Sequence, residues 1–251
     1  MEQNRRDFLI RGGAGLTGGL LVYLIPKVPQ AIVREEGKEF DWTEHYFAYV
    51  VDTTKCIGCG NCVRACKNEN SVSEEYYRTW VERYVVTDTE RVYVDSPNGG
   101  GEGFPVNGEM EGKAVKGFFV PKLCNQCRNT PCNQVCPVHA SYLAAGGVVL
   151  VDKKQCIGCG YCVQACPYGS RYIDPQTHTA DKCTWCYHRI TKGLSPACVQ
   201  SCPAEARKFG NLKEEGSLIK KLIESERVGH LRPNLNTEPY CFYIGLDKVV
   251  R

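Results

Sequence analysis

The residues of this sequence best suited to chemistry are cysteines, which fall into four groups of four along the chain. In the first and third groups, successive cysteines are separated by two, two and three residues, whereas the other groups widen the second gap. The four groups are Cys56, Cys59, Cys62 and Cys66; Cys124, Cys127, Cys132 and Cys136; Cys156, Cys159, Cys162 and Cys166; and Cys183, Cys186, Cys198 and Cys202. Thiolates at this spacing are typical ligands of iron–sulfur clusters.

The spacing of the cysteines in the tight loops of the first and third groups has a physical reason. Three thiolates in one loop can face three corners of a cubane, and glycines such as Gly58 and Gly160 let the backbone pass close to it. The fourth cysteine points away and binds the other cluster of a pair. Proline follows the fourth cysteine in three groups and restricts the loop exit, whereas Lys67 follows Cys66. The sequence therefore predicts four [4Fe–4S] clusters.

Zinc and disulfides are the alternative roles for these cysteines. Structural zinc uses two separated cysteine pairs and needs no third thiol two residues further on. Disulfides are permitted after export, but a chain that is exported already folded has folded in a reducing cytoplasm. The iron–sulfur interpretation is favoured over both.

The number of thiolates bears on the choice between catalysis and electron transfer. A metal site that acts on a substrate keeps an open coordination position. Here sixteen cysteines provide a thiolate ligand for every iron of four cubanes, so no open position is expected. The histidines lack the paired pattern of a Rieske centre and are predicted to be surface or structural residues; they are His45, His139, His178, His188 and His230. The sequence thus predicts an electron-transfer protein without catalytic residues.

The segments between the groups must hold these loops in place. The longest, residues 67–123, is an insertion in which residues 79–87 and 91–94 alternate like the strands of a hairpin. Residues 117–120 are typical of a further strand that enters the second group. We interpret the insertion as a cap over the cluster domain; a docking surface for a catalytic partner is the alternative. Residues 214–227 are predicted to form an amphipathic helix that buries Leu218, Leu222 and Ile223.

Four further residues attract attention by their positions. Trp185, Tyr161 and Lys182 adjoin predicted ligands and are candidates for tuning cluster potentials, with plain packing as the alternative. Cys241 belongs to no group and lies in an apolar, strand-like run. We predict a buried and inert thiol there; a fifth metal site or an intermolecular bond is the alternative.

Length and composition limit the class of protein. The chain has 251 residues, of which 17 are cysteine, and its formal net charge is +3. This near-neutral charge argues against a nucleic-acid-binding protein, which needs a concentrated basic face. Disulfide scaffolds are usually below about 100 residues, and a chain of this length can bury a core of its own. With 43% hydrophobic residues, one large or two small globular domains are predicted.

Paired arginines open the sequence. Arg5 and Arg6 precede an apolar, glycine-rich stretch over residues 12–25, which matches a twin-arginine export signal; an ordinary amphipathic helix is the alternative. That route carries folded proteins and suits a cofactor inserted in the cytoplasm. Residues 1–31 are therefore predicted to be a signal or N-terminal anchor, residues 32–48 a linker or arm, and residues 49–251 the cluster domain. The predicted location is the periplasmic face of the cytoplasmic membrane.

The sequence resembles the four-cluster, ferredoxin-like electron-transfer subunits of membrane-bound oxidoreductases, as found in polysulfide, dimethyl sulfoxide, formate and nitrite systems. The resemblance covers residues 49–246 and includes residues 149–152, 166–169, 180–183, 237–239 and 243–245. It implies an α+β fold made of tandem bacterial-ferredoxin-like units, two pseudo-symmetric two-cluster modules with a β-rich insertion.

The resemblance also implies how the cysteines pair. The implied sets are Cys56, Cys59, Cys62 and Cys202 (set 1); Cys66, Cys183, Cys186 and Cys198 (set 2); Cys124, Cys127, Cys132 and Cys166 (set 3); and Cys136, Cys156, Cys159 and Cys162 (set 4). Spacing alone would also allow the first group to pair with the second.

The partners are likewise implied by the resemblance. Such a subunit relays electrons between a quinone-interacting integral membrane subunit and a catalytic partner. That partner is either a molybdopterin enzyme or a cytochrome or iron–sulfur subunit, as in the membrane complex linked to sulfite reduction. Nucleic acid is not expected as a partner. The alternative is a stand-alone polyferredoxin or redox-binding protein without a fixed catalytic partner.

Overall fold

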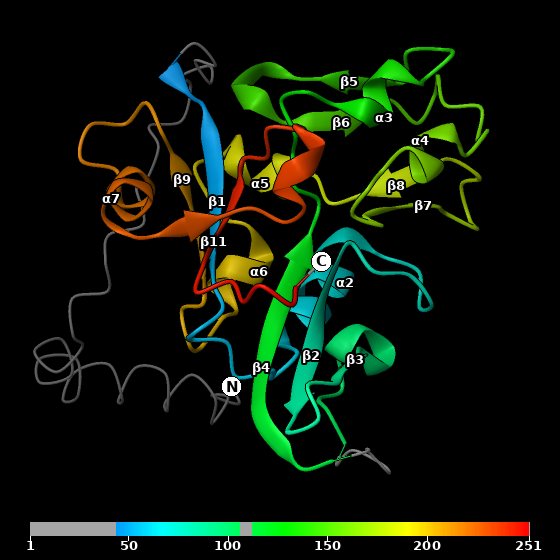
Figure 1. The fold of residues 1–251 in the computed structure, drawn as a ribbon. Coiled ribbons are helices and arrows are strands. Elements are labelled where there is room, and N and C mark those ends of the chain that lie inside the picture. Colours follow the sequence, from blue (N-terminus) through cyan, green and yellow to red (C-terminus); the bar gives the residue numbers. More distant parts are fainter. Residues whose placement is uncertain (1–43, 106–111, 251) are drawn as a thin grey trace, which may run out of the picture. The chain divides into compact units, whose positions relative to one another are not determined.

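The structure is a computed structural model that describes residues 44–105 and 112–250. The predicted signal or anchor at residues 1–31 and most of the predicted linker at residues 32–48 lie outside the described residues. Within the described ranges, no helix has the length and apolar character needed to cross a membrane. Figure 1 shows the elements in sequence order from blue to red.

A four-stranded sheet organises one part of the core. In spatial order its strands are β10 (Val228–Gly229), β11 (Cys241–Ile244), β1 (Phe47–Asp52) and β9 (Arg207–Asn211). The central strand β1 pairs in parallel with β11 and antiparallel with β9. All of its residues are buried, because it has a neighbouring strand at each edge and is covered on both faces. Its side chains alternate, so that Ala48 and Val50 join one apolar cluster while Tyr49 and Val51 join another.

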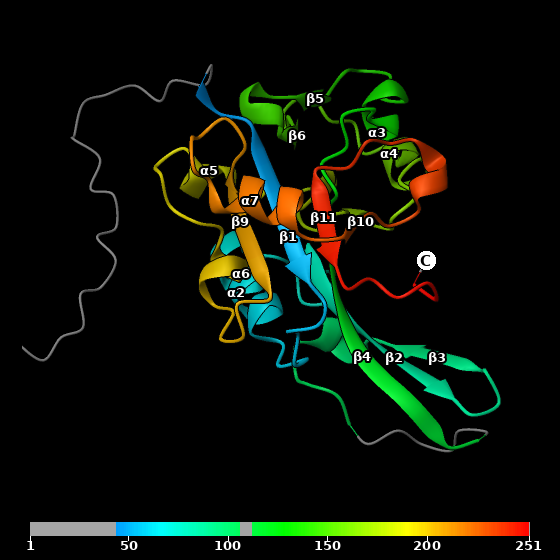
Figure 2. The same ribbon diagram turned by 60° about the vertical axis from the view of Figure 1, so that its left-hand side comes forward.

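Helix α7 (Leu218–Ser225) covers the Ala48 and Val50 face of this sheet, as Figure 2 shows. The sequence predicts a longer helix with Leu218 buried, and both predictions are wrong. Ile219 is the buried residue, whereas the Leu218 side chain is 57% exposed. The helix begins only after Gly216, whose positive φ belongs to a turn, so Leu218 is its first residue and faces away from the sheet. Ile223 packs against the same cluster as predicted.

The insertion forms a second, three-stranded antiparallel sheet. Its strands are β3 (Val92–Asp95), β2 (Thr79–Thr87) and β4 (Ala114–Leu123), in that spatial order. The predicted hairpin and further strand are confirmed, and a short 3-10 helix, η3 (Pro97–Gly100), follows β3. Both views show this sheet extending away from β1 as a long ribbon (Figures 1 and 2). The end of β4 leads directly into Cys124, so the insertion positions the second cysteine group.

A recurring strand pair brackets the cysteine groups. The strand after one group's last cysteine pairs antiparallel with a strand that precedes another group. These pairs are β5 (Ser141–Leu143) with β6 (Val149–Val151), β7 (Arg171–Ile173) with β8 (Ala180–Lys182), and β9 with β1. The pairing in space is what brings the end of one group next to the start of another.

A short helix holds the third cysteine of every group. These helices are α2 (Asn61–Asn70), α3 (Pro131–Gln134), α4 (Tyr161–Gln164) and α6 (Ala197–Gln200); a further helix, α5 (Tyr187–Ile190), follows Cys186. In the repeated loops, Gly60 and Gly160 precede their helices with φ values of 72° and 77°, a conformation that favours glycine. Pro167 disfavours helix at Cys166, so α4 stops early. Because Lys67 replaces that proline, α2 continues to Asn70.

Candidate iron–sulfur sites

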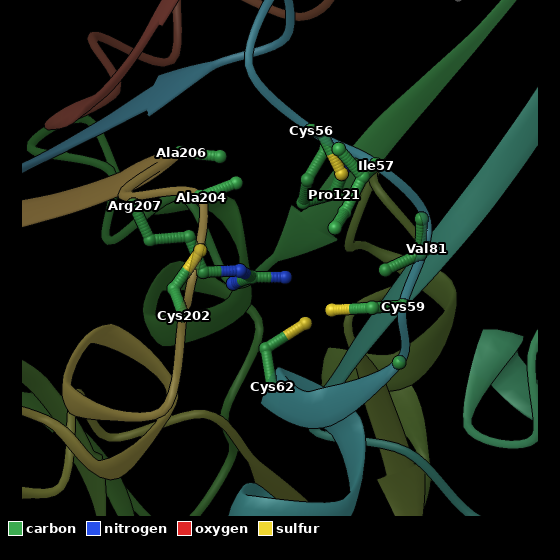
Figure 3. A pocket seen from close by; sticks show the side chains of 11 residues that line it. Cys56, Ile57, Cys59, Cys62, Val81, Pro121, Cys202, Ala204, Ala206 and Arg207 are labelled. Atoms are coloured by element: carbon green, nitrogen blue, oxygen red, sulfur yellow. The ribbon is translucent and has the colours of Figure 1, made fainter.

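Set 1 surrounds a single cavity (Figure 3). Cys56, Cys59 and Cys62 of the first loop line it together with Cys202, which follows α6. The cavity and the open space at its mouth together amount to about 320 Å³, and the remaining wall includes Arg207 at the start of β9. Figure 3 shows the sulfur atoms of Cys59, Cys62 and Cys202 facing the space into which the Arg207 side chain extends.

Set 3 surrounds a second cavity of the same size. Cys124, Cys127 and Cys132 line it with Cys166, and the cavity and the open space at its mouth together amount to about 320 Å³. Arg171, at the start of β7, again completes the wall. The fourth cysteine therefore comes from the third group, as in the set implied by the resemblance.

In sets 2 and 4, side-chain contacts and helix packing bring the cysteines close to one another. In set 2 the Asn70 Nδ2 lies 3.6 Å from the sulfurs of both Cys66 and Cys186, and helix α2 packs against α6, which carries Cys198. For set 4, helices α3 and α4 pack together ahead of Cys136 and around Cys162. The assignment of all four sets as iron ligands stays a prediction.

The geometry of the cysteines distinguishes a cluster from a single ion. A zinc ion requires sulfurs at about 2.3 Å from one centre. Within residues 44–105 and 112–250, no three cysteine, histidine or acidic side chains converge closely enough to hold one ion. Thiols spread around a cavity suit a cubane with several irons. All 17 cysteines lie in the described residues, and none of them forms a disulfide there.

Burial sets the protonation of the metal-free thiols. Loss of hydration raises the pKa of Cys56 to about 11 and that of Cys127 to about 12. In Cys136, N–H groups of Ser141, Val138 and Ala140 outweigh the effect of burial and lower the pKa. Because thiolates are the form that binds metal, loading of the buried sets must release protons.

Several polar groups approach the sulfurs of predicted ligands. The backbone N–H of Ala180 donates to the Cys156 sulfur at 3.3 Å, and that of Trp185 donates to Cys183 at 3.4 Å. The Tyr49 hydroxyl lies 3.2 Å from the Cys198 sulfur. Such contacts influence cluster potentials. Four of the residues near the thiols were not predicted from the sequence: Tyr49, Asn70, Arg171 and Arg207. Tyr49 meets Cys198 only through the tertiary fold. Asn70 follows Cys66 by four residues, and each arginine follows the last cysteine of a group by five, so a local signal for these three was present.

The predicted tuning candidates differ in their surroundings. Trp185 is buried beside the rings of Tyr49 and Phe209. Lys182 is also buried, and its ammonium donates to the carbonyl oxygens of Val149 and Cys183. Tyr161 is 57% exposed, so solvent weakens its electrostatic influence. A role in tuning stays a prediction for all three.

Cys241 lies in β11 and is completely buried. This confirms the predicted burial and the strand-like run. Burial raises the pKa of its thiol above the ordinary value, which keeps the sulfur protonated and poorly reactive. The predicted inertness follows from the same environment.

The insertion covers the first cysteine loop. A side chain at Gly60 would place its Cβ 2.3 Å from the carbonyl oxygen of Gly100, and one at Gly58 would meet the ring of Phe119. Arg64 donates a hydrogen bond to the carbonyl oxygen of Gly101. These contacts support the interpretation of the insertion as a cap; a docking role stays open.

Models of known protein families match both halves of the chain. Two family models, each described as a 4Fe-4S dicluster domain, match residues 55–140 and 115–212. These matches confirm the α+β fold of tandem ferredoxin-like units and the four [4Fe–4S] clusters. Eight of the sixteen grouped cysteines line the two cavities described above, and which cysteines bind which cluster stays a prediction.

Three relatives span nearly the whole chain or most of it. One subunit of the tetrathionate reductase of Salmonella typhimurium is 39% identical over 98% of this chain and 90% of its own length. A component of the polysulfide reductase of Wolinella succinogenes is 35% identical over 79% of this chain and 93% of its own. The Hdr-like menaquinol oxidoreductase iron-sulfur subunit 1 of Archaeoglobus fulgidus is 32% identical, over 97% and 98%.

Proposed function

This chain is a member of the family of ferredoxin-like, four-cluster electron-transfer subunits of membrane-bound oxidoreductases, and on this premise we propose that it relays electrons between a quinone-interacting membrane subunit and a catalytic subunit. We further propose that sets 1 to 4 are the ligand sets of its four clusters. The relay would operate at the periplasmic face of the cytoplasmic membrane.

The observation that carries the proposal is the continuity of the cysteine sets. Cys62 of set 1 and Cys198 of set 2 are electrostatic neighbours, as are Cys183 of set 2 and Cys124 of set 3. Cys132 of set 3 packs in one apolar cluster with Cys162 of set 4. Each set is therefore close to the next in the order 1, 2, 3, 4. A [4Fe–4S] cluster with four thiolate ligands supplies one-electron transfer without binding a substrate.

The names of relatives support the two partners. The relatives from Salmonella typhimurium and Wolinella succinogenes are named as parts of a tetrathionate reductase and a polysulfide reductase, which favours a catalytic partner for this chain. The name of the relative from Archaeoglobus fulgidus includes menaquinol, which favours a quinone-interacting partner for this chain. A molybdopterin enzyme and a cytochrome or iron–sulfur subunit are the two classes proposed for the catalytic side.

Purification of the complete protein from native membranes tests the relay. We expect about sixteen irons per chain, since each cluster holds four, together with one integral membrane subunit and one larger catalytic subunit. Recovery of the fully loaded chain alone from the soluble fraction would favour the stand-alone polyferredoxin and overturn the proposal.

Export requires its own experiment. We propose that Arg5 and Arg6 direct the folded chain through the twin-arginine route. The double substitution Arg5→Lys and Arg6→Lys should leave the protein on the cytoplasmic side, protected from protease added to spheroplasts, while the unaltered chain is accessible. Equal accessibility of both proteins would contradict the proposal, whatever the outcome for the partners.

A further inference from the structure

Two arginines are buried beside the cysteine sets without a carboxylate partner. Arg207 is 1% exposed and Arg171 is 4% exposed. Among the described residues, neither forms an ion pair with an aspartate or a glutamate. A guanidinium remains charged in proteins, and an uncompensated buried charge is costly. Each arginine therefore needs negative charge from another source.

Arg207 lies between sets 1 and 2. It lines the cavity of set 1, and Figure 3 shows its guanidinium among the sulfurs of that set. Its Nη2 donates to the Thr79 hydroxyl at 2.9 Å, and its Nη1 lies 3.4 Å from the Tyr49 hydroxyl. That hydroxyl in turn contacts the sulfur of Cys198 in set 2. One guanidinium thus faces both sets.

Arg171 has the corresponding place between sets 3 and 4. It lines the cavity of set 3, and its Nη2 donates to the Ser141 hydroxyl at 2.7 Å. Its Nε and Nη1 are buried and have no hydrogen-bond partner among the described residues. Its electrostatic neighbours are the thiols of Cys132 and Cys124 in set 3 and of Cys162 in set 4, together with the buried ammonium of Lys182. The two buried N–H donors therefore lie next to thiols, that of Cys162 among them, where an anionic cofactor can accept from them.

The two arginines occupy equivalent places in the sequence. Each follows the last cysteine of its group in the order Cys-Pro-x-x-x-Arg, at residues 166–171 and 202–207. The same spacing after Cys136 reaches Ser141 instead, and this serine accepts the hydrogen bond from Arg171. Lys182 lies between sets 2 and 3, where Cys124 and Cys183 are its neighbours. Its ammonium already has two carbonyl partners, so the inference is limited to the arginines.

Electrostatics of the metal-free thiols agree with this placement. Burial lowers the pKa of Arg207, but Cys62, Tyr49 and Cys198 outweigh burial, so that the pKa lies above its ordinary value. In the same way, Cys132, Cys124 and Cys162 outweigh the effect of burial on the pKa of Arg171. Since a guanidinium stays protonated in proteins, both cations are charged where they lie, next to two sets each.

We propose that Arg207 and Arg171 are tuning residues, each shared by the two clusters that flank it and raising the reduction potential of both. The four thiolates of a [4Fe–4S] cluster outweigh its positive core, and reduction adds further negative charge. A buried cation consequently stabilises the reduced form more than the oxidised form. A shared cation also weakens the repulsion between two reduced neighbours. The inference rests on the cluster sets proposed above.

The test is a redox titration of the complete, iron-loaded protein followed by EPR. In Arg207→Gln, we expect the equilibrium constants for reduction of the clusters of sets 1 and 2 to fall at least tenfold. This corresponds to a decrease in reduction potential of about 59 mV for a one-electron couple. In Arg171→Gln, sets 3 and 4 should shift instead. Arg207→Lys and Arg171→Lys retain the charge and should restore most of each shift. The cluster signals are assigned with Cys→Ser variants of each set.

Exposed lysines close to the same sets provide matched controls. Lys55 precedes Cys56 and its side chain is 56% exposed, while Lys153 precedes Cys156 and is 46% exposed. Each of these lysines is also paired with a carboxylate, Lys55 with Asp52 and Lys153 with Asp174. Lys55→Gln and Lys153→Gln therefore remove a charge that solvent screens and a carboxylate already balances, and should cause much smaller shifts. Unchanged potentials in both arginine-to-glutamine variants at full iron content would overturn the inference. The inference would also be overturned if the reduction potentials shifted equally in the arginine-to-glutamine and arginine-to-lysine variants.

Iron content separates this inference from the proposed sets. If Arg207→Gln loses iron, the Arg171 variants decide the matter by the same criterion, since they concern other clusters. If the sets themselves are wrong, the Cys→Ser variants remove the wrong signals before any potential is compared. If the sets are right and the cations have no electrostatic role, only the potentials fail to move.

Discussion

The Tyr49 hydroxyl lies 3.2 Å from the sulfur of Cys198, although the two residues are 149 positions apart. Tyr49 is completely buried in the central strand β1, and Cys198 lies in helix α6. The strand that forms the core of the sheet thus also provides a polar contact to a predicted cluster ligand. Folding of the sheet and the environment of set 2 are therefore linked.

Removal of this hydroxyl should lower one reduction potential. Tyr49→Phe keeps the ring packing but loses a hydrogen bond to sulfur worth about 1 kcal/mol, or roughly 40 mV for one electron. A redox titration followed by EPR should show the decrease chiefly in the cluster of set 2, because Arg207, which also contacts this hydroxyl, keeps its charge beside set 1. Tyr243→Phe is the control, because the Tyr243 hydroxyl donates to the Pro121 carbonyl oxygen. Equal shifts in both variants would contradict the specific role of Tyr49.

The crossed pairing of the cysteines can be tested by comparing lost signals. Cys166→Ser should abolish the same EPR signal as Cys127→Ser and leave about twelve irons per chain. Cys159→Ser should abolish a different signal. If Cys166→Ser and Cys159→Ser remove the same cluster, ligands are taken within one group and the proposed sets 3 and 4 are wrong.

Equivalent glycines of the two repeated loops should differ in their tolerance of a side chain. At Gly160 no atom lies within 4 Å of an added Cβ, so Gly160→Ala should cost only the strain of positive φ, about 1–2 kcal/mol. At Gly60 the Cβ would meet the backbone oxygen of Gly100 at 2.3 Å, so Gly60→Ala should cost about 3 kcal/mol or more. Denaturant unfolding of both variants measures the difference, and similar losses would contradict the cap formed by the insertion.

The ion pair between Arg78 and Asp181 should be important for stability. Both carboxylate oxygens of Asp181 accept hydrogen bonds from Arg78, each at 2.8 Å, and both side chains are largely buried. Asp181→Asn leaves a buried guanidinium without its counter-charge, so the free energy of unfolding should fall by about 3–5 kcal/mol. The exposed carboxylate of Glu205, paired with Lys208, provides the control. Glu205→Gln should have no measurable effect; equal losses in both variants would refute the argument from burial.

Replacement of Cys241 should affect stability but not iron. Cys241→Ala removes one buried sulfur from the core and should lower the free energy of unfolding by about 1 kcal/mol. Iron content and all cluster potentials should match those of the unaltered chain. Loss of iron from this variant would instead show that the seventeenth cysteine is a ligand.

The sequence by itself determined the number and kind of cofactors. Ligation by a tight loop is local, so the spacing from Cys56 to Cys62 already indicates a cluster. Strands are also local patterns, and the alternation in residues 79–87 correctly predicted β2. The burial of Cys241 followed from the apolar run around it.

Only the tertiary structure decided which distant residues meet. Cys202 lies next to the loop of Cys56 because β9 pairs with β1. This contact joins the two ends of the domain, and the spacing of cysteines along the sequence does not predict it. The same pairing carries Arg207 into the protein beside the thiols. Leu218 is exposed and Ile219 buried because Ile219 lies on the side of α7 that packs against β1 and β9. Local chemistry therefore follows from the sequence, whereas the electrostatic environment of each cluster depends on long-range pairing.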